Sequence, residues 1–184
     1  MARASSRTAS TGDMVRSLVV ILLPLIAITY FFTRTPDGPD VKTVEWAPVL
    51  VQARDQAPYP VLAPRAVPPA WRATQVTWVP QGRAYLNGEP SPRNLWELGF
   101  LDADNTFVEL VQGDLEAREL VEDKTREGLA DGSSDVAGDT WDRRISADER
   151  TRSLVRTADG ATTIVVGDLS YGALESFAST LATD

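Results

Sequence analysis

The chain has 184 residues, of which 18 are basic and 26 acidic, and it contains no histidine and no cysteine. It can therefore form no disulfide, thiol nucleophile or Cys- or His-based zinc site, and it lacks the commonest general base. The acidic balance predicts no binding to nucleic acid, because phosphates would be repelled, and it favours neutral or cationic partners.

The first feature along the chain is an apolar stretch at residues 14–32, which is interrupted only by Arg16, Ser17, Pro24 and Thr29. A helix of this length would rise about 28 Å, close to the ~30 Å hydrocarbon thickness of a bilayer. We therefore predict a transmembrane signal-anchor helix over residues 14–32 that contacts the lipid bilayer. A buried core helix is the alternative, but such a helix is usually shorter and amphipathic.

The flanks of this stretch suggest an orientation. Residues 1–13 are polar and basic, which predicts a disordered cytoplasmic tail. The protein would then be a single-pass protein of the plasma membrane with its C-terminal domain outside the cytoplasm. A cleavable signal peptide is the rival interpretation, but bulky residues at 30–32 occupy the place where cleavage needs small ones. Residues 33–44 are rich in Pro, Gly and Asp and predict a linker.

Residues 45–184 predict one extracytoplasmic α+β domain. Its first half contains a short helix with Pro48 in the first turn and a proline-rich segment over residues 58–70. Alternating patterns then predict strands over 72–79 and 95–101, separated by a loop over 80–93. A turn at 102–105 returns the chain in a strand over 106–111, which makes a hairpin.

The second half repeats this order. Asp114 is positioned to cap a helix that ends near Gly128, and a loop around Gly132 follows. Strands are predicted over 140–145, 151–157 and 162–167, the last two joined by Asp159-Gly160, and Ser170 caps a final helix that reaches residue 182. Gly-Asp-Leu occurs at both 113–115 and 167–169. We expect an antiparallel sheet with helices packed on one face, and two strand-strand-strand-helix repeats remain an open option.

Two groups of Asp and Asn residues are candidates for a metal site. Asp102, Asp104 and Asn105 place oxygen atoms at alternate positions, as calcium loops do, but these residues are also ordinary in hairpin turns. The second group comprises Asp131, Asp135 and Asp139. The first group lacks the glycine and the distal glutamate of a calcium loop, and the second is no stronger a candidate. We predict no metal ligand and no cofactor.

Few features of the sequence favour an enzyme. A carboxylate-dependent envelope hydrolase stays open in principle, because two acidic side chains can supply acid and base. The acidic residues considered fall in predicted turns or on helix surfaces, and Asp114 and Asp168 are interpreted as helix caps. No nucleophile elbow, phosphate loop or Ser-x-x-Lys motif is present. We therefore predict no catalytic residue and no enzyme.

The five tryptophans allow two interpretations. Trp78, Trp96 and Trp141 fall on predicted strands and are expected in the core, whereas Trp46 and Trp71 flank the proline-rich segment and are expected to hold it in place. Alternatively, tryptophans could line a groove that binds a lipid or a glycan.

Several segments together resemble a known family. They are DMVRSLVV at 13–20, VLVQAR at 49–54, YPVLAP at 59–64 leading to Trp71-Arg72, and VVGD at 165–168 before the last helix. In this order they resemble the actinobacterial domain-of-unknown-function 4245 family, which consists of small single-pass membrane proteins. The resemblance implies a membrane location and an α+β ectodomain, but no activity.

The expected function is a membrane-anchored, extracytoplasmic binding or accessory module of the bacterial cell envelope. Its partner would be an envelope protein or a neutral or cationic ligand, and the oligomeric state is open. The alternatives are the carboxylate-dependent hydrolase and the lipid- or glycan-binding domain.

Overall fold

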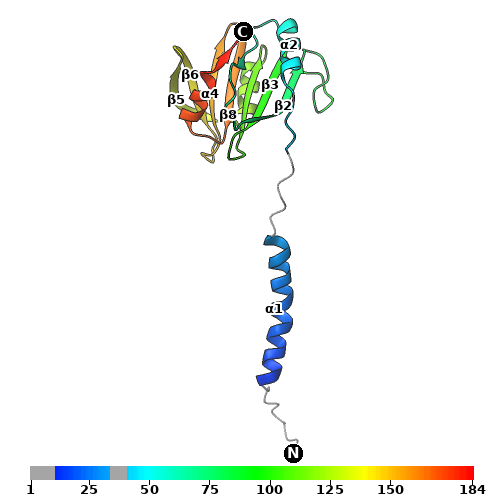
Figure 1. The fold of residues 1–184 in the computed structure, drawn as a ribbon. Helices are drawn as coiled ribbons and strands as arrows, with labels where there is room; N and C mark the ends of the chain where they lie inside the picture. The colour runs from blue at the N-terminus through cyan, green and yellow to red at the C-terminus, as the bar shows by residue number, and fades with distance from the viewer. Residues whose placement is uncertain (1–10, 34–40) are drawn as a thin grey trace, which may run out of the picture. The chain divides into compact units, whose positions relative to one another are not determined.

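The computed structural model describes residues 11–33 and 41–184. Contacts divide the chain into a unit that ends at Val41 and a second unit, Lys42–Asp184 (Figure 1). The tail predicted over residues 1–13 lies mostly outside the described residues. Residues 34–40 of the predicted linker lie outside them as well.

The described part of the first unit is the helix α1 (Thr11–Thr33), which exposes apolar side chains from Met14 to Tyr30. Within residues 11–33 and 41–184, no helix combines the length and the apolar character that crossing a membrane requires. The prediction of a transmembrane helix over residues 14–32 is therefore wrong, and the bilayer contact predicted through it is without support. Arg16 and Ser17 interrupt the stretch, so its apolar part begins at Leu18 and is shorter than the ~20 residues of a typical span.

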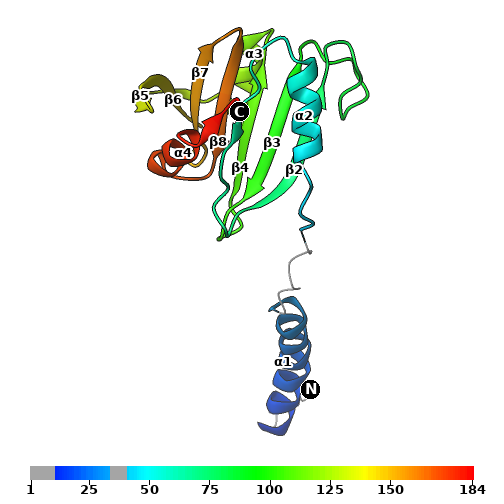
Figure 2. The ribbon, with the colours of Figure 1, turned by 45° about the horizontal axis from the view of Figure 1, so that its top comes forward.

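The second unit is built on a seven-stranded sheet in which all neighbours are antiparallel, with the order β2-β3-β4-β8-β7-β6-β5 (Figure 2). Its strands are β2 (Arg72–Val79), β3 (Leu95–Leu101), β4 (Phe107–Gly113), β5 (Leu129–Val136), β6 (Asp139–Ile145), β7 (Arg152–Ala158) and β8 (Ala161–Gly167). A smaller sheet pairs β1 (Ala63–Pro64) with β9 (Leu181–Ala182). The antiparallel α+β prediction is confirmed.

Both predicted hairpins form. The β3–β4 turn is held by the Asp102 carboxylate, which accepts hydrogen bonds from the backbone N–H groups of Asp104 at 2.9 Å and Thr106 at 2.7 Å. In the β7–β8 turn, Asp159 and Gly160 have φ angles of 52° and 82°. Two consecutive residues with positive φ match the twist of the flanking strands, which is why Asp-Gly is favoured there.

Helices cover both faces of the sheet, so the expectation of helices on one face is wrong. α2 (Ala47–Gln56) and α4 (Tyr171–Ala178) lie on one face in Figure 2, and α3 (Ala117–Lys124) packs on the opposite face. The reason lies in the central strands. On β3, Trp96 and Phe100 belong to the larger apolar cluster, whereas Leu95 on the other face belongs to the smaller one. Because both faces carry apolar side chains, both need cover.

The two halves do not form a symmetric repeat. A two-fold axis that relates antiparallel neighbours β4 and β8 would keep equivalent residues on the same face. Leu110 and Ile164, which the Gly-Asp-Leu match makes equivalent, belong to different apolar clusters on opposite faces. The helices that follow, α3 and α4, are on opposite faces as well.

Two local predictions also need correction. Residues 129–136 form β5, where the sequence predicted the end of a helix and a loop around Gly132. The last helix begins after the Ser170 cap, as predicted, but it ends at Ala178, and Leu181 instead pairs with Pro64 in the small sheet. Backbone pairing with a neighbouring segment decides both cases, and sequence periodicity does not reveal it.

The tryptophans pack in or against the larger apolar cluster. Trp96 and Trp141 are buried, and the other three, Trp46, Trp71 and Trp78, are partly buried against the same cluster. The indole N–H of Trp96 donates to the carbonyl of Leu62 in the proline-rich segment at 3.0 Å. The predicted core role is confirmed, and this arrangement does not support a tryptophan-lined groove.

Candidate functional site

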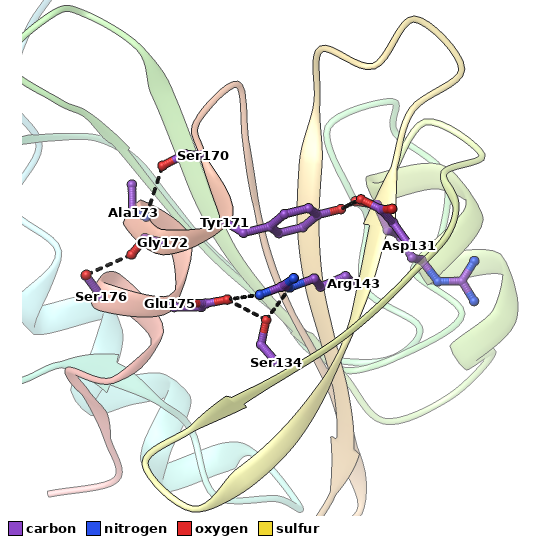
Figure 3. A network of polar contacts seen from close by, with 10 residues as sticks. Asp131, Ser134, Arg143, Ser170, Tyr171, Gly172, Ala173, Glu175 and Ser176 are labelled. Atoms are coloured by element: carbon purple, nitrogen blue, oxygen red, sulfur yellow. Dashed lines mark hydrogen bonds and ion pairs between the residues drawn. The ribbon is translucent and has the colours of Figure 1, made fainter.

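One polar cluster joins α4 to the β5–β6 hairpin (Figure 3). The Glu175 carboxylate accepts hydrogen bonds from Ser134 Oγ at 2.5 Å and from Arg143 Nη2 at 2.7 Å, and Arg143 Nε donates to Ser134 Oγ at 2.6 Å. Beside them, the Tyr171 hydroxyl donates to Asp131 at 2.8 Å, and the Arg143 guanidinium lies 4.7 Å from the centre of the Tyr171 ring.

This cluster is a structural clamp. Ser134 is buried, and its hydroxyl is fully engaged by Glu175 and Arg143. Hydrogen bonds from Ser134 and then from Arg143 lower the pKa of the Glu175 carboxyl, so the pair stays charged.

The clamp predicts a measurable stability effect. Arg143→Met removes the cation and leaves Glu175 with the Ser134 hydroxyl alone, so the free energy of unfolding should fall by about 1–3 kcal/mol. Urea denaturation of the full chain measures the change. Arg150→Met, which removes a more exposed ion pair with Asp168, is the matched control and should change stability little. Equal effects of the two substitutions would contradict the clamp.

A second polar cluster lies beneath α3. Glu97 on β3 and Glu109 on β4 point to the same face of the sheet, because β3 and β4 pair with Gly99 opposite Glu109. Lys124 at the end of α3 places its Nζ 2.6 Å from Glu97 Oε1 and 3.4 Å from Glu109 Oε2. The Tyr85 hydroxyl, from the loop between β2 and β3, lies 2.9 Å from Glu97 Oε2.

Burial sets the electrostatics of this second cluster. The Glu97 side chain is fully buried, at 0% exposure. Burial, with the nearby Glu97 charge, raises the pKa of the Glu109 carboxyl despite the opposing effect of Lys124. For Lys124, burial lowers the pKa, but Glu109 and Glu97 raise it by more, so the amine stays charged. Burial and then Glu97 raise the pKa of Tyr85 to about 12, so its hydroxyl keeps its proton.

Two cavities flank this cluster. The first, which we call the α3 cavity, measures about 280 Å³, and the second, which we call the Phe107 cavity, about 310 Å³. Asp123 and Lys124 line both. The α3 cavity is also lined by Tyr85, Asn87, Glu89, Pro90, Ser91, Pro92, Arg93, Leu95, Glu97, Glu119 and Leu120. The Phe107 cavity is also lined by Phe107, Glu109, Arg126, Thr151, Val166, Gly167 and Asp168.

The α3 cavity combines an apolar floor with unpaired carboxylates. Leu95 and Leu120 are buried, whereas Glu119 and Asp123 are exposed and therefore lie at its mouth. Within residues 41–184, the Glu119 and Asp123 carboxylates form no hydrogen bond and no ion pair.

The cations at the α3 cavity are already neutralised. Arg93 Nη2 binds the Glu116 carboxylate at 2.9 Å, and Lys124 binds Glu97 and Glu109. The unpaired charge of this cavity is therefore negative.

Comparison with known proteins identifies the family. A family described as "Protein of unknown function (DUF4245)" matches residues 7–181. The chain belongs to the DUF4245 family. This confirms the family resemblance seen in the sequence. No curated protein matches this DUF4245 chain.

Solved structures give only a distant likeness. The crystal structure of MucB in complex with MucA(peri) is 17% identical with a TM-score of 0.35, and the match covers 66% of this chain and 36% of that one. The complex structure of Pseudomonas aeruginosa MucA/MucB is also 17% identical, with a TM-score of 0.36 and coverage of 69% and 36%. The DUF4245 chain thus spans little more than a third of these chains, and at such TM-scores the likeness carries no argument about function.

The residues considered as metal ligands lie apart from the two cavities. Asp102 and Asp104 belong to the β3–β4 turn, and Asn105 accepts a hydrogen bond from Arg72 at 2.7 Å. Within the part of the chain that the structure describes, no group of three or more acidic side chains is arranged to hold a metal ion. The second group is dispersed as well, because its members bind different partners: Asp131 binds Tyr171, Asp135 the backbone of Gly138, and Asp139 Arg156.

The helix caps predicted at Asp114 and Asp168 are wrong. α3 begins after Glu116, which has a φ of 50°, and no side chain caps it. Asp114 instead accepts hydrogen bonds from Asn94 at 2.7 and 2.9 Å. Asp168 lines the Phe107 cavity and accepts from Thr151 and Arg150, each at 2.6 Å. Hydrogen bonding to Thr151 is the main reason that the pKa of Asp168 is lowered.

Sequence reasoning missed the second cluster. Glu97 and Glu109 each stand between apolar neighbours in a buried strand, and a carboxylate in such a place needs a buried partner. That signal was available, but it does not name Lys124 as the partner.

Proposed function

We propose that this DUF4245 protein is a non-enzymatic binding module and that the α3 cavity is its ligand site. The observation that carries the proposal is the charge balance of this cavity. Its cations, Arg93 and Lys124, are neutralised by protein carboxylates, while Glu119 and Asp123 stay unpaired at the mouth. A place in the cell envelope outside the cytoplasm stays a prediction from the sequence.

The lining of the α3 cavity favours a particular ligand chemistry. Leu95 and Leu120 offer an apolar floor, and the partly buried Tyr85 ring adds an apolar wall. An elongated group with an aliphatic stem and a positive end would place the stem on this floor and the charge at the carboxylates. Lysine and arginine side chains have this form, and a cavity of about 280 Å³ has room for one.

The same geometry argues against the carboxylate-dependent hydrolase. Such an enzyme needs two carboxyl groups that flank one scissile bond. Here the Lys124 amine lies between Glu97 and Glu109, and the two carboxylates line different cavities. A substrate bond therefore has no place between them.

A pair of small probes tests the proposal. Nα-acetyl-lysine methylamide should bind the full chain, and the norleucine analogue, which has a similar stem and no charge, should bind more weakly. Neutralising the mouth with Glu119→Gln and Asp123→Asn should weaken the lysine probe about fivefold, because partly exposed ion pairs each contribute little. An NMR titration measures both affinities and locates the binding.

The matched control is Glu45→Gln with Asp55→Asn. It also neutralises two exposed carboxylates, but these lie at α2 on the other side of the sheet. The control should leave lysine binding unchanged. Equal binding of the two probes, or signal changes away from the α3 cavity, would refute this site.

A further inference from the structure

The geometry points to an extended peptide segment as the ligand, with a basic side chain in the α3 cavity and an apolar side chain in the Phe107 cavity. This inference rests on the proposed function, because it assumes that the α3 cavity receives a basic group. It adds the class of the ligand, the second subsite and the order of the two side chains.

The two cavities are adjacent at the end of α3. Asp123 and Lys124 belong to the linings of both, so a ligand that fills both cavities must pass over these two residues. The Lys124 amine is held by Glu97 and Glu109 and is not free to bind a ligand anion. The Asp123 carboxylate is exposed and unpaired within the described residues, so it can accept a hydrogen bond from a ligand N–H at the junction.

The Phe107 cavity suits an apolar side chain. Phe107 is 40% exposed, and its ring is packed over Gly99, where an added Cβ would come within 2.6 Å of the ring. The Phe107 ring can pack here because Gly99 has no side chain. Val166 adds a second apolar surface at this cavity.

The charged groups of the Phe107 cavity discourage a second basic side chain. Apart from Asp123 at the shared border, the carboxylates of this cavity are paired, Glu109 with Lys124 and Asp168 with Arg150 and Thr151. Arg126, whose guanidinium forms no hydrogen bond or ion pair in the described part of the chain, would repel a cation. The basic group is therefore expected in the α3 cavity and the apolar one beside Phe107.

A ligand that fills both cavities at once must carry two side groups on one connected backbone. Each cavity holds about one side chain, and the shared border places a hydrogen-bond acceptor, Asp123, between them. A peptide supplies two side chains joined by a backbone that carries N–H donors. A simple polyamine supplies the charge but has no apolar group for Phe107.

Three probes test this inference on the full chain: acetyl-Lys-Gly-Phe-amide, acetyl-Lys-Gly-Ala-amide and spermidine. The phenylalanine peptide should bind about tenfold more tightly than the alanine peptide, because it buries a ring against Phe107. Phe107→Ala should abolish this difference, whereas Glu119→Gln should weaken both peptides by the same factor. Leu115→Ala, which removes a similarly exposed apolar side chain that lines neither cavity, should change nothing.

The outcomes separate the two proposals. If the two peptides bind equally and Phe107→Ala has no effect, the extended ligand is wrong but the lysine site stands. If spermidine binds as tightly as the phenylalanine peptide, the ligand is an amine and not a peptide. If none of the three probes binds, the proposed function fails as well. If Phe107→Ala lowers the melting temperature too far for binding to be measured, Phe107→Leu is used in its place. Leucine keeps an apolar contact with Gly99.

Discussion

Lys124→Met should be one of the most destabilising single substitutions in this protein. Among the described residues, Lys124 Nζ is the ion-pair partner of two buried carboxylates, Glu97 and Glu109, and the change removes this cation. Breaking a buried ion pair by removing one partner typically costs about 3–5 kcal/mol, a large part of the ~5–15 kcal/mol that stabilises a domain. Urea denaturation of the full chain at pH 7 measures the loss.

Two further variants isolate the cause. Arg118→Met removes a cation from the same helix, but its partner Glu122 is at the surface, so the unfolding midpoint should move little. Adding Glu97→Gln and Glu109→Gln to Lys124→Met should restore most of the lost free energy of unfolding. Burying a neutral amide costs less free energy than burying a charged carboxylate. A Lys124→Met chain that unfolds like the wild type would mean that the two carboxylates are not held as buried charges.

The pH dependence provides a second readout of the same effect. Burial already raises the pKa of the Glu109 carboxyl in the folded chain, and without Lys124 no cation opposes that shift. The folded state then binds more protons than the unfolded state, so stability falls as the pH rises through this window. The deficit of Lys124→Met should therefore shrink as the pH is lowered from 7 to 5.

Local signals in the sequence were sufficient for most strands. β2 and β3 begin and end at the predicted residues, 72–79 and 95–101, because alternating side chains and flanking turn residues mark them. The Asp159-Gly160 turn set the register of β7 and β8, since its positive φ angles admit few other residues.

β5 could not be predicted in the same way. It contains Gly132 in its interior, few of its residues are buried, and its register shifts between Ala130 and Ser133. Such a strand has no alternating apolar pattern and forms because β6 offers its backbone groups for pairing. The predicted start of α3 is also wrong. Glu116 has a left-handed backbone conformation, so the helix begins only after it.

The candidate site depends on tertiary placement. The β3–β4 register, which follows from the turn, already puts Glu97 and Glu109 on one face of the sheet. Which helix covers that face does not follow from any local pattern, because α3 and α4 both have an apolar side. Lys124 and the two cavities beside it emerge only when α3 is placed.

Phe177→Ala should have an effect of similar size on the opposite face of the sheet. Phe177 is 4% exposed, stacks on Trp71 with ring centres 5.3 Å apart, and meets Phe100 edge to face at 5.7 Å. The ring thus joins α4 to Trp71, which follows the proline-rich segment, and to β3, and its loss should cost about 3–5 kcal/mol. Thermal unfolding of the full chain measures this, and Val51→Ala on the exposed side of α2 is the control that should melt like the wild type.

This substitution also separates the core from the ligand site. The ring lies in the larger apolar cluster, whereas the α3 cavity borders the smaller cluster on the other face. Below its lowered melting temperature, the Phe177→Ala chain should therefore bind the lysine probe with unchanged affinity. If it instead melts normally and loses the probe, α4 presents Phe177 to ligand, and the binding face is the one that α2 and α4 cover.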